Sequence, residues 1–176
     1  WRACPRRSGS PWRGARPWAD IQKSGTLIAA TGGDLKPFNY FEGKKLTGFE
    51  IELAEAIAQK MGLKVEWKVL SFDSLLAGLQ RDRWDLAISS HGITEERAKV
   101  VDFSNPHYCG GATIVSKDGK VQKAADMAGK TVAVQTGTTY LARLNDLKKS
   151  GEVDIDSVKN FPLDRDARAA TVSNRA

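Results

Sequence analysis

Cysteine is almost missing from this chain of 176 residues, which contains only Cys4 and Cys109. Because Cys4 falls in an arginine-rich opening stretch, the body of the chain has a single cysteine, which excludes a fold held together by disulfide bonds. Long apolar runs are missing too, and no stretch approaches the roughly 18 apolar residues of a membrane-spanning helix. With 41% hydrophobic and 27% charged residues, the composition is that of an ordinary globular protein with one core or two modest lobes.

Acidic residues are absent from the first 19 positions, which contain five arginines. These arginines supply most of the formal net charge of +6, so the chain from Asp20 onward is close to neutral. The body therefore offers no electrostatic basis for binding nucleic acid or a membrane surface. Residues 1–19 also lack an initiator methionine, the apolar region of a signal peptide and any apolar periodicity, and we expect a disordered or non-native tail there.

Side chains for covalent catalysis or metal binding are scarce. Ser89 and Ser90 lack a histidine placed to activate them, since His91 is an adjacent turn residue. His107 and Cys109 would share one face of an extended strand, but no further ligand lies near them to complete the tetrahedral set of a structural zinc site. We therefore expect no catalytic centre, no metal and no cofactor.

The first half of the body alternates strand and helix patterns. Strands are predicted at 26–31, 63–69 and 84–90, and helices at 48–61 and 72–79. The first helix carries an apolar stripe that we expect to face the core, namely Phe49, Leu53, Ala56, Ile57 and Met61. Such a βαβαβ run predicts a mostly parallel sheet with right-handed crossovers.

A second α/β unit follows an extended stretch at 107–117. It comprises a short helical segment at 121–129, strands at 131–135 and 153–158, and helices at 140–147 and 164–173. The strand at 131–135 is continuously apolar, so we expect it to be central in its sheet. The sequence thus predicts a tail at 1–19, lobe 1 at 20–110 and lobe 2 at 111–176.

The segment 86–106 contains a candidate anion site. An apolar strand ends in two hydroxyl residues, turns through Gly92 and enters a short helix capped by Thr94. Arg97 lies in the first turn of that helix, where a cation opposes the helix dipole by about 0.3–1 kcal/mol. A planar cation beside Ser90 and free backbone donors is suited to a carboxylate. The alternative is a solvated surface arginine.

A second candidate anion site lies at 136–139, between the strand at 131–135 and the following helix. Free backbone N–H groups at such a turn bind anions, although plain capping by a threonine needs no ligand. The turn lacks the glycine and lysine pattern of a phosphate loop, which argues against a nucleotide. Thr138 and Thr139 would face Arg97 from the opposite lobe, an arrangement that suits a small carboxylate held in a cleft. Phe72 either forms a wall of that cleft or packs in the core.

The chain resembles the amino-acid-binding family of extracytoplasmic solute-binding proteins that serve ABC importers, solute-binding family 3. The stretches that carry this resemblance are KPF (36–38), LTGFEIEL (46–53), WDLAISS (84–90), ITEER (93–97), VDFS (101–104) and VQTGTT (134–139). By their order and spacing, the resemblance covers residues 20–176 almost continuously. The resemblance implies the two-lobed α/β fold of periplasmic binding proteins, type II.

The resemblance also assigns roles to the candidate site. Arg97 would bind the α-carboxylate of the ligand, Phe72 would stack on the ligand, and Gln135 would line the side-chain end. The helpers of Arg97 would be the Ser90 and Gly92 backbone together with Thr138 and Thr139.

Three departures from the family pattern accompany these roles. Gly32 and Leu35 replace an acid and an aromatic residue, with Asp34 as a possible substitute for the acid, and Gly92 replaces a hydroxyl residue. The acid that usually takes the α-ammonium would fall beyond Ala176, as would the strand that returns to lobe 1. We therefore expect a chain truncated at its C-terminus, with an incomplete second lobe.

By resemblance the protein binds an amino acid without chemistry, delivers it to a membrane permease, and is extracytoplasmic, either periplasmic or membrane-anchored, and monomeric when complete. One alternative is a prephenate or arogenate dehydratase on the same fold, since GDLKPFNY (33–40) is similar to the corresponding loop of that group. A second alternative is the sensory ligand-binding domain of a receptor kinase or a cell-wall lyase.

Overall fold

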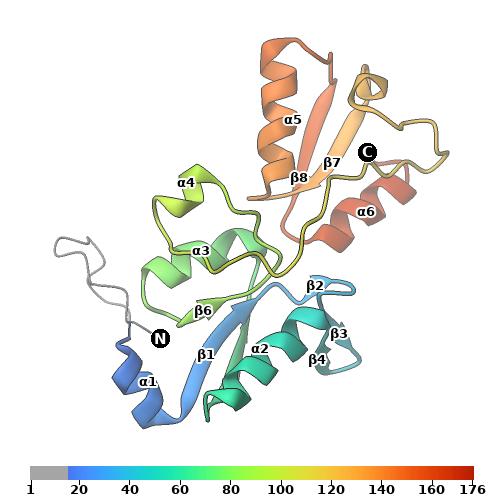
Figure 1. Ribbon diagram of the computed structural model, residues 1–176. Helices are drawn as coiled ribbons and strands as arrows, with labels where there is room; N and C mark the ends of the chain where they lie inside the picture. Colours follow the sequence, from blue (N-terminus) through green and yellow to red (C-terminus); the bar gives the residue numbers. More distant parts are fainter. Residues whose placement is uncertain (1–15) are drawn as a thin grey trace.

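The computed structural model describes residues 16–176, which form two α/β lobes (Figure 1). Most of the expected tail, residues 1–15, lies outside the described residues. Residues 16–19, which we placed in the tail, instead belong to lobe 1, because helix α1 (Trp18–Ser24) begins there. Arg16 donates to the carboxylate of Asp85 (Nε–Oδ1 3.0 Å) and to the carbonyl of Thr26 (2.7 Å), which attaches this part of the chain to the sheet.

The sheet of lobe 1 is parallel, as the sequence predicts. Strand β1 (Thr26–Thr31) lies between β5 (Lys64–Val69) and β6 (Leu86–Ala87), the last of which is much shorter than expected. Helix α2 (Phe49–Lys60) packs with Leu27 on one face of the sheet, and helix α3 (Phe72–Gln80) packs with Ala30 on the other. Since side chains alternate along a strand, the two helices cover opposite faces.

Helix α2 turns a different face to the core than its apolar stripe predicts. Phe49, Ile57 and Met61 are 46%, 48% and 46% exposed, so the expected stripe is wrong. The buried residues of α2 are Glu50, Ile51, Ala54 and Ala58. Alanine side chains let the helix lie close to β1, whose Ala29 and Ala30 are fully buried.

A small antiparallel sheet precedes α2 and was not predicted. It consists of β2 (Asp34–Leu35), β3 (Asn39–Glu42) and β4 (Lys45–Thr47). Gly48 connects this sheet to α2 with φ 123°, and a Cβ atom there would lie 2.4 Å from the Phe38 carbonyl oxygen. The loop at 32–38 is thereby placed directly above the N-terminus of α2.

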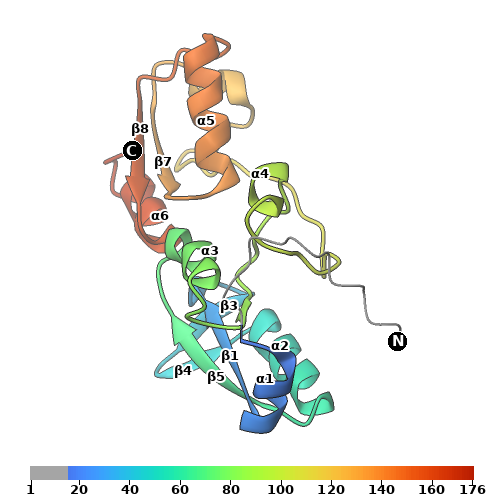
Figure 2. The ribbon, with the colours of Figure 1, turned by 90° about the vertical axis from the view of Figure 1, so that its left-hand side faces the viewer.

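Lobe 2 begins after a long connection without strands at residues 99–123, which follows helix α4 (Glu95–Ala98). Its elements are the 3₁₀ helix η1 (Ala124–Met127), β7 (Thr131–Gln135), α5 (Thr139–Ser150), β8 (Ser157–Phe161) and α6 (Asp164–Val172). Figure 2 shows the two lobes end to end, with α4 beside the region where they meet.

Strand β7 is not central in the described part of the chain, contrary to expectation, because it pairs with β8 alone. Strand β8 also begins later than predicted, since Val153 and Ile155 are buried against Met127 and Leu147 instead of lying in the sheet. The apolar run at 131–135 is therefore explained by packing against α5 and α6, and not by neighbouring strands on both sides. No helix within residues 16–176 combines the length and apolar character needed to cross a membrane.

The packing of α3 on Trp84 generates a stability prediction. A Cβ atom at Gly78 would lie 1.9 Å from the Trp84 ring, which is 6% exposed. Gly78→Ala should therefore lower the free energy of unfolding by about 1–3 kcal/mol through overpacking, although alanine normally favours a helix. Urea denaturation measures this effect. Gly111→Ala is the control, because open space surrounds Gly111, and equal stability of the two variants would contradict the described packing.

Candidate functional site

Arg97 lies where the two lobes meet. Helix α4 begins after Thr94, whose Oγ1 accepts a hydrogen bond from the Arg97 backbone N–H (3.2 Å). The guanidinium donates from Nη1 to the Gly92 carbonyl in lobe 1 and from Nη2 to the Gly137 carbonyl in lobe 2, both at 2.8 Å. Partial burial lowers the pKa of Arg97, yet guanidinium groups remain charged in proteins. Arg97 is thus a half-buried cation whose partners are neutral carbonyls.

The turn before α4 contains buried polar atoms without a hydrogen-bond partner among the described residues. Ser90 has φ +53°, and its Oγ is buried without a hydrogen-bond partner among the described residues, as is Nδ1 of His91. A Cβ atom at Gly92 would lie 3.8 Å from both Arg97 Nη1 and Thr139 Cγ2. The Gly92 turn therefore faces the N-terminus of α5 across the lobe boundary.

Phe72 provides an aromatic surface beneath the guanidinium. Its ring stacks on His91 with centroids 4.3 Å apart and an interplanar angle of 14°, and the Arg97 guanidinium carbon lies 5.7 Å from the Phe72 centroid. Phe72 also packs against the core cluster of Ala30, Leu75 and Trp84. Both roles considered for Phe72, cleft wall and core residue, are therefore compatible.

The second lobe contributes the turn at 136–139. Thr138 Oγ1 accepts from Leu141 N (3.2 Å) and donates to the Gln135 carbonyl (2.8 Å), so Thr138 performs the plain capping role. Gly137 has φ +78°, and a Cβ atom there would lie 2.8 Å from Asp73 Cβ in α3. Only glycine allows the turn to approach lobe 1 this closely.

A second contact between the lobes is centred on Asp34. Its Oδ2 accepts from the backbone N–H of Asp164 at the start of α6 (2.8 Å) and from Nε2 of Gln135 (3.4 Å). Burial raises the pKa of Asp34, although the hydrogen bond from Asp164 acts in the opposite direction. Leu35 follows in β2, half-buried and paired with Asn39.

The predicted site residues thus form two groups. Arg97, Gly92, Phe72 and Thr139 come together around the guanidinium, while Asp34 and Gln135 meet at the other contact. Of the two residues considered as a metal pair, His107 contacts Glu50 and Cys109 is exposed. Within residues 16–176, no group of three or more His, Cys, Asp or Glu side chains is arranged to hold a metal ion.

Sequence reasoning missed Glu50, which is fully buried at the start of α2. Its Oε2 accepts from Asn39 Nδ2 (2.6 Å), and its Oε1 accepts from the Ser90 backbone N–H (2.7 Å) and contacts His107 Nε2 (3.0 Å). An acid in the first turn of a helix is expected to be exposed and to interact with the helix dipole. The signal that would have revealed Glu50 is its spacing, since Glu50, Ala54 and Ala58 recur every fourth residue on the buried face.

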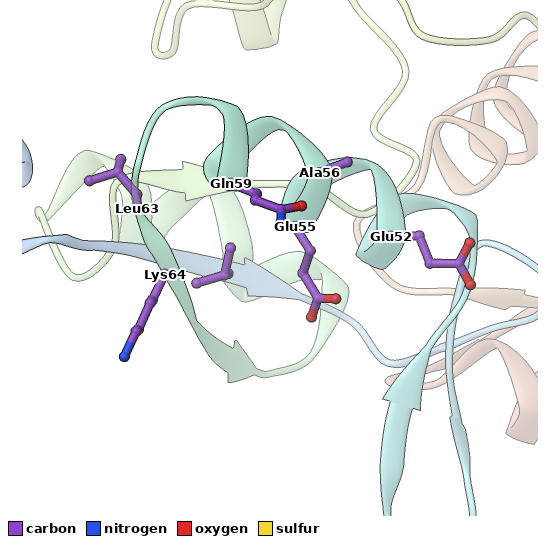
Figure 3. A pocket seen from close by; sticks show the side chains of 7 residues that line it. Glu52, Glu55, Ala56, Gln59, Leu63 and Lys64 are labelled. Atoms are coloured by element: carbon purple, nitrogen blue, oxygen red, sulfur yellow. The ribbon is translucent and has the colours of Figure 1, made fainter.

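An open surface pocket of about 490 Å³ lies away from the lobe boundary (Figure 3). Its lining comes from α2 and the start of β5, namely Glu52, Glu55, Ala56, Gln59, Leu63, Lys64 and Val65. None of the predicted site residues is among them.

Comparison with known proteins matches residues 27–162 to the family described as bacterial extracellular solute-binding proteins, family 3. The arginine-binding extracellular protein ArtP of Bacillus subtilis (strain 168) is 44% identical over 113 residues, which are 64% of this chain and 44% of ArtP. The chain spans about half the length of the curated relatives it matches.

Solved structures of amino-acid-binding proteins are also similar to this chain. The ancestral amino acid-binding protein AncCDT-1, a precursor of cyclohexadienyl dehydratase, is 35% identical with a TM-score of 0.82, covering 90% of this chain and 70% of that one. An ancestral arginine-binding protein bound to arginine is also 35% identical, with a TM-score of 0.74 and coverage of 86% and 67%.

The stacked position of His91 generates a pH prediction. Burial, and then the charge of Arg97, lower the pKa of His91 from 6.5 to about 4. Below pH 6.5 the unfolded chain binds a proton that the folded chain resists, so the free energy of unfolding should fall between pH 6.5 and pH 4, by on the order of 3 kcal/mol. Urea denaturation should show that His91→Gln removes this part of the fall. If the variant showed the same pH dependence as the original protein, the lowered pKa of His91 would be contradicted.

Proposed function

The chain belongs to the bacterial extracellular solute-binding proteins of family 3, and on this premise we propose that it captures an amino acid between its lobes for an extracytoplasmic step of ABC import. The membrane partner is then the permease of the importer. The observation that carries this proposal is Arg97, a half-buried cation at the lobe boundary that lies over Phe72.

The partners of Arg97 support a carboxylate ligand. Its two hydrogen bonds go to neutral carbonyls, at Gly92 and Gly137, and no acid within residues 16–176 forms an ion pair with the guanidinium. A carboxylate adds charge and accepts two parallel hydrogen bonds from the planar fork. Such a contact contributes about 1.5–3 kcal/mol, whereas micromolar binding needs about 8 kcal/mol, so burial between the lobes supplies most of the remainder.

Asp34 supports a ligand that also carries a positive group. This carboxylate is half-buried between the lobes, and its described partners are the backbone N–H of Asp164 and the amide of Gln135. An ammonium or guanidinium placed there would stabilise the ionised carboxylate and so oppose the effect of burial, which raises the pKa of Asp34. The name of ArtP agrees with this chemistry, and L-arginine is therefore the first ligand to test.

A second candidate function is the dehydratase reaction on prephenate or arogenate. The observation that favours it is the similarity to AncCDT-1, whose description makes it a precursor of such an enzyme. Incubation of the protein with prephenate separates the two functions, because only the enzyme releases an aromatic product.

The carboxylate assignment predicts the behaviour of two variants. Arg97→Ala should weaken the binding of L-arginine at least roughly tenfold, because the ligand carboxylate loses its charged partner. Arg97→Lys should recover little of the affinity, since an ammonium cannot form the bidentate contact. Isothermal titration calorimetry with L-arginine, followed by the other amino acids, measures this. Unchanged affinity in both variants would rule the assignment out.

A matched prediction concerns Asp34. Asp34→Asn keeps the shape of the side chain but removes its charge, so it should weaken binding of L-arginine more than binding of L-glutamine. The comparison of the two ligands by calorimetry separates the loss of charge from a general change in lobe contact. An equal loss for both ligands would show that Asp34 does not pair with the guanidinium of L-arginine.

A further inference from the structure

The geometry points to Glu50 as a positioning residue for the carboxylate site, which holds the Ser90–Gly92 turn and the loop before Asp34 in a single arrangement. This inference rests on the function proposed above. It concerns a residue that makes no contact of its own with Arg97 among the described hydrogen bonds.

The first argument is the cost of burying a carboxylate. Glu50 is fully buried, and an ionised carboxylate accepts hydrogen bonds but donates none. Such a group is tolerated in a protein interior only when donors surround it. Asn39 and Ser90 supply donors at 2.6 and 2.7 Å, and His107 Nε2 contacts the same carboxylate at 3.0 Å. The three residues come from β3, from the site turn and from the segment that leaves lobe 1. One side chain therefore joins three separate parts of the chain.

The second argument is the conformation of Ser90. A non-glycine residue at φ +53° lies in the left-handed region, which is unfavourable for a residue with a Cβ atom. The hydrogen bond from the Ser90 N–H to a buried carboxylate compensates for this cost and stabilises the turn. Two residues later the same turn presents the Gly92 carbonyl that accepts from Arg97 Nη1. The orientation of the guanidinium thus depends on a turn that Glu50 stabilises.

The third argument is the path from Glu50 to the second lobe contact. Asn39 donates to Glu50 from Nδ2, and its Oδ1 accepts from the backbone N–H of Gly33 at 2.8 Å. Both ends of the amide are therefore engaged, which fixes its orientation. Gly33 directly precedes Asp34, the acid that contacts lobe 2. Hydrogen bonds thus connect the Glu50 carboxylate both to the turn that contacts Arg97 and to the loop that carries Asp34.

The test compares Glu50→Gln with Glu52→Gln, a matched control in the same turn of α2 whose side chain is exposed. The amide introduced by Glu50→Gln offers one acceptor oxygen in place of two, so this variant should accelerate hydrogen exchange of the Ser90 amide by roughly ten- to a hundredfold. It should also weaken the binding of L-arginine by at least roughly tenfold. Glu52→Gln should change neither quantity. If Glu50→Gln does not fold, Glu50→Asp takes its place in the test. This variant keeps the acidic group but shortens the side chain, and it should still exchange the Ser90 amide faster than Glu52→Gln.

Hydrogen exchange at Ser90 needs no ligand, and for this reason it separates the two proposals. If Arg97→Ala binds L-arginine normally, the proposed function fails while the exchange result still tests Glu50. If both Glu50 variants exchange the Ser90 amide at the rate seen in Glu52→Gln, the positioning role is overturned. A third outcome also overturns the positioning role. In it, Glu50→Gln accelerates exchange but binds L-arginine with unchanged affinity, while Arg97→Ala binds it at least roughly tenfold more weakly. Glu50 would then stabilise the turn without positioning the site.

Discussion

The buried carboxylate of Glu50 is the constraint on which the arrangement of lobe 1 depends. It must face inward to meet Asn39 and Ser90, and residues spaced by four positions on a helix share one face. Ala54 and Ala58 are consequently turned toward the sheet with it, while Phe49 and Ile57 are turned toward solvent. The observed rotation of α2 thus satisfies the hydrogen bonds of Glu50 and buries Ile51, while Phe49 and Ile57 stay exposed.

Apart from the side-chain amide of Gln135, the hydrogen bonds described between the lobes join side chains of lobe 1 to backbone atoms of lobe 2. Arg97 donates to a carbonyl at Gly137, and Asp34 accepts from the N–H of Asp164 at the start of α6. Free backbone groups of this kind occur where a strand ends and where a helix begins. The α/β pattern of lobe 2 thus generates partners for charged residues of lobe 1 without requiring charged residues of its own.

Local patterns in the sequence were sufficient for much of the architecture. The strand at 26–31 and the helices around 49–60 and 72–80 follow from apolar periodicity, and Arg97 stands out because a cation in the first turn of a helix opposes the dipole. The rotation of α2 could not be predicted, since it depends on Asn39 and Ser90, which are distant in sequence from Glu50. The same applies to β7, whose apolar residues are buried by helices rather than by strands on both sides. In each case the missing information is a long-range contact rather than a local preference.

Gly137 has a consequence for how proteins of this design can diversify. A close approach between the turn at 136–139 and α3 involves a residue without a side chain, and the adjoining hydrogen bond uses its carbonyl oxygen. Every amino acid has that oxygen, but only glycine leaves space for Asp73. On the lobe 2 side this contact thus uses backbone alone, while lobe 1 contributes the side chain of Arg97. Substitutions at neighbouring positions can therefore diversify the side chains around the turn while this backbone contact is kept.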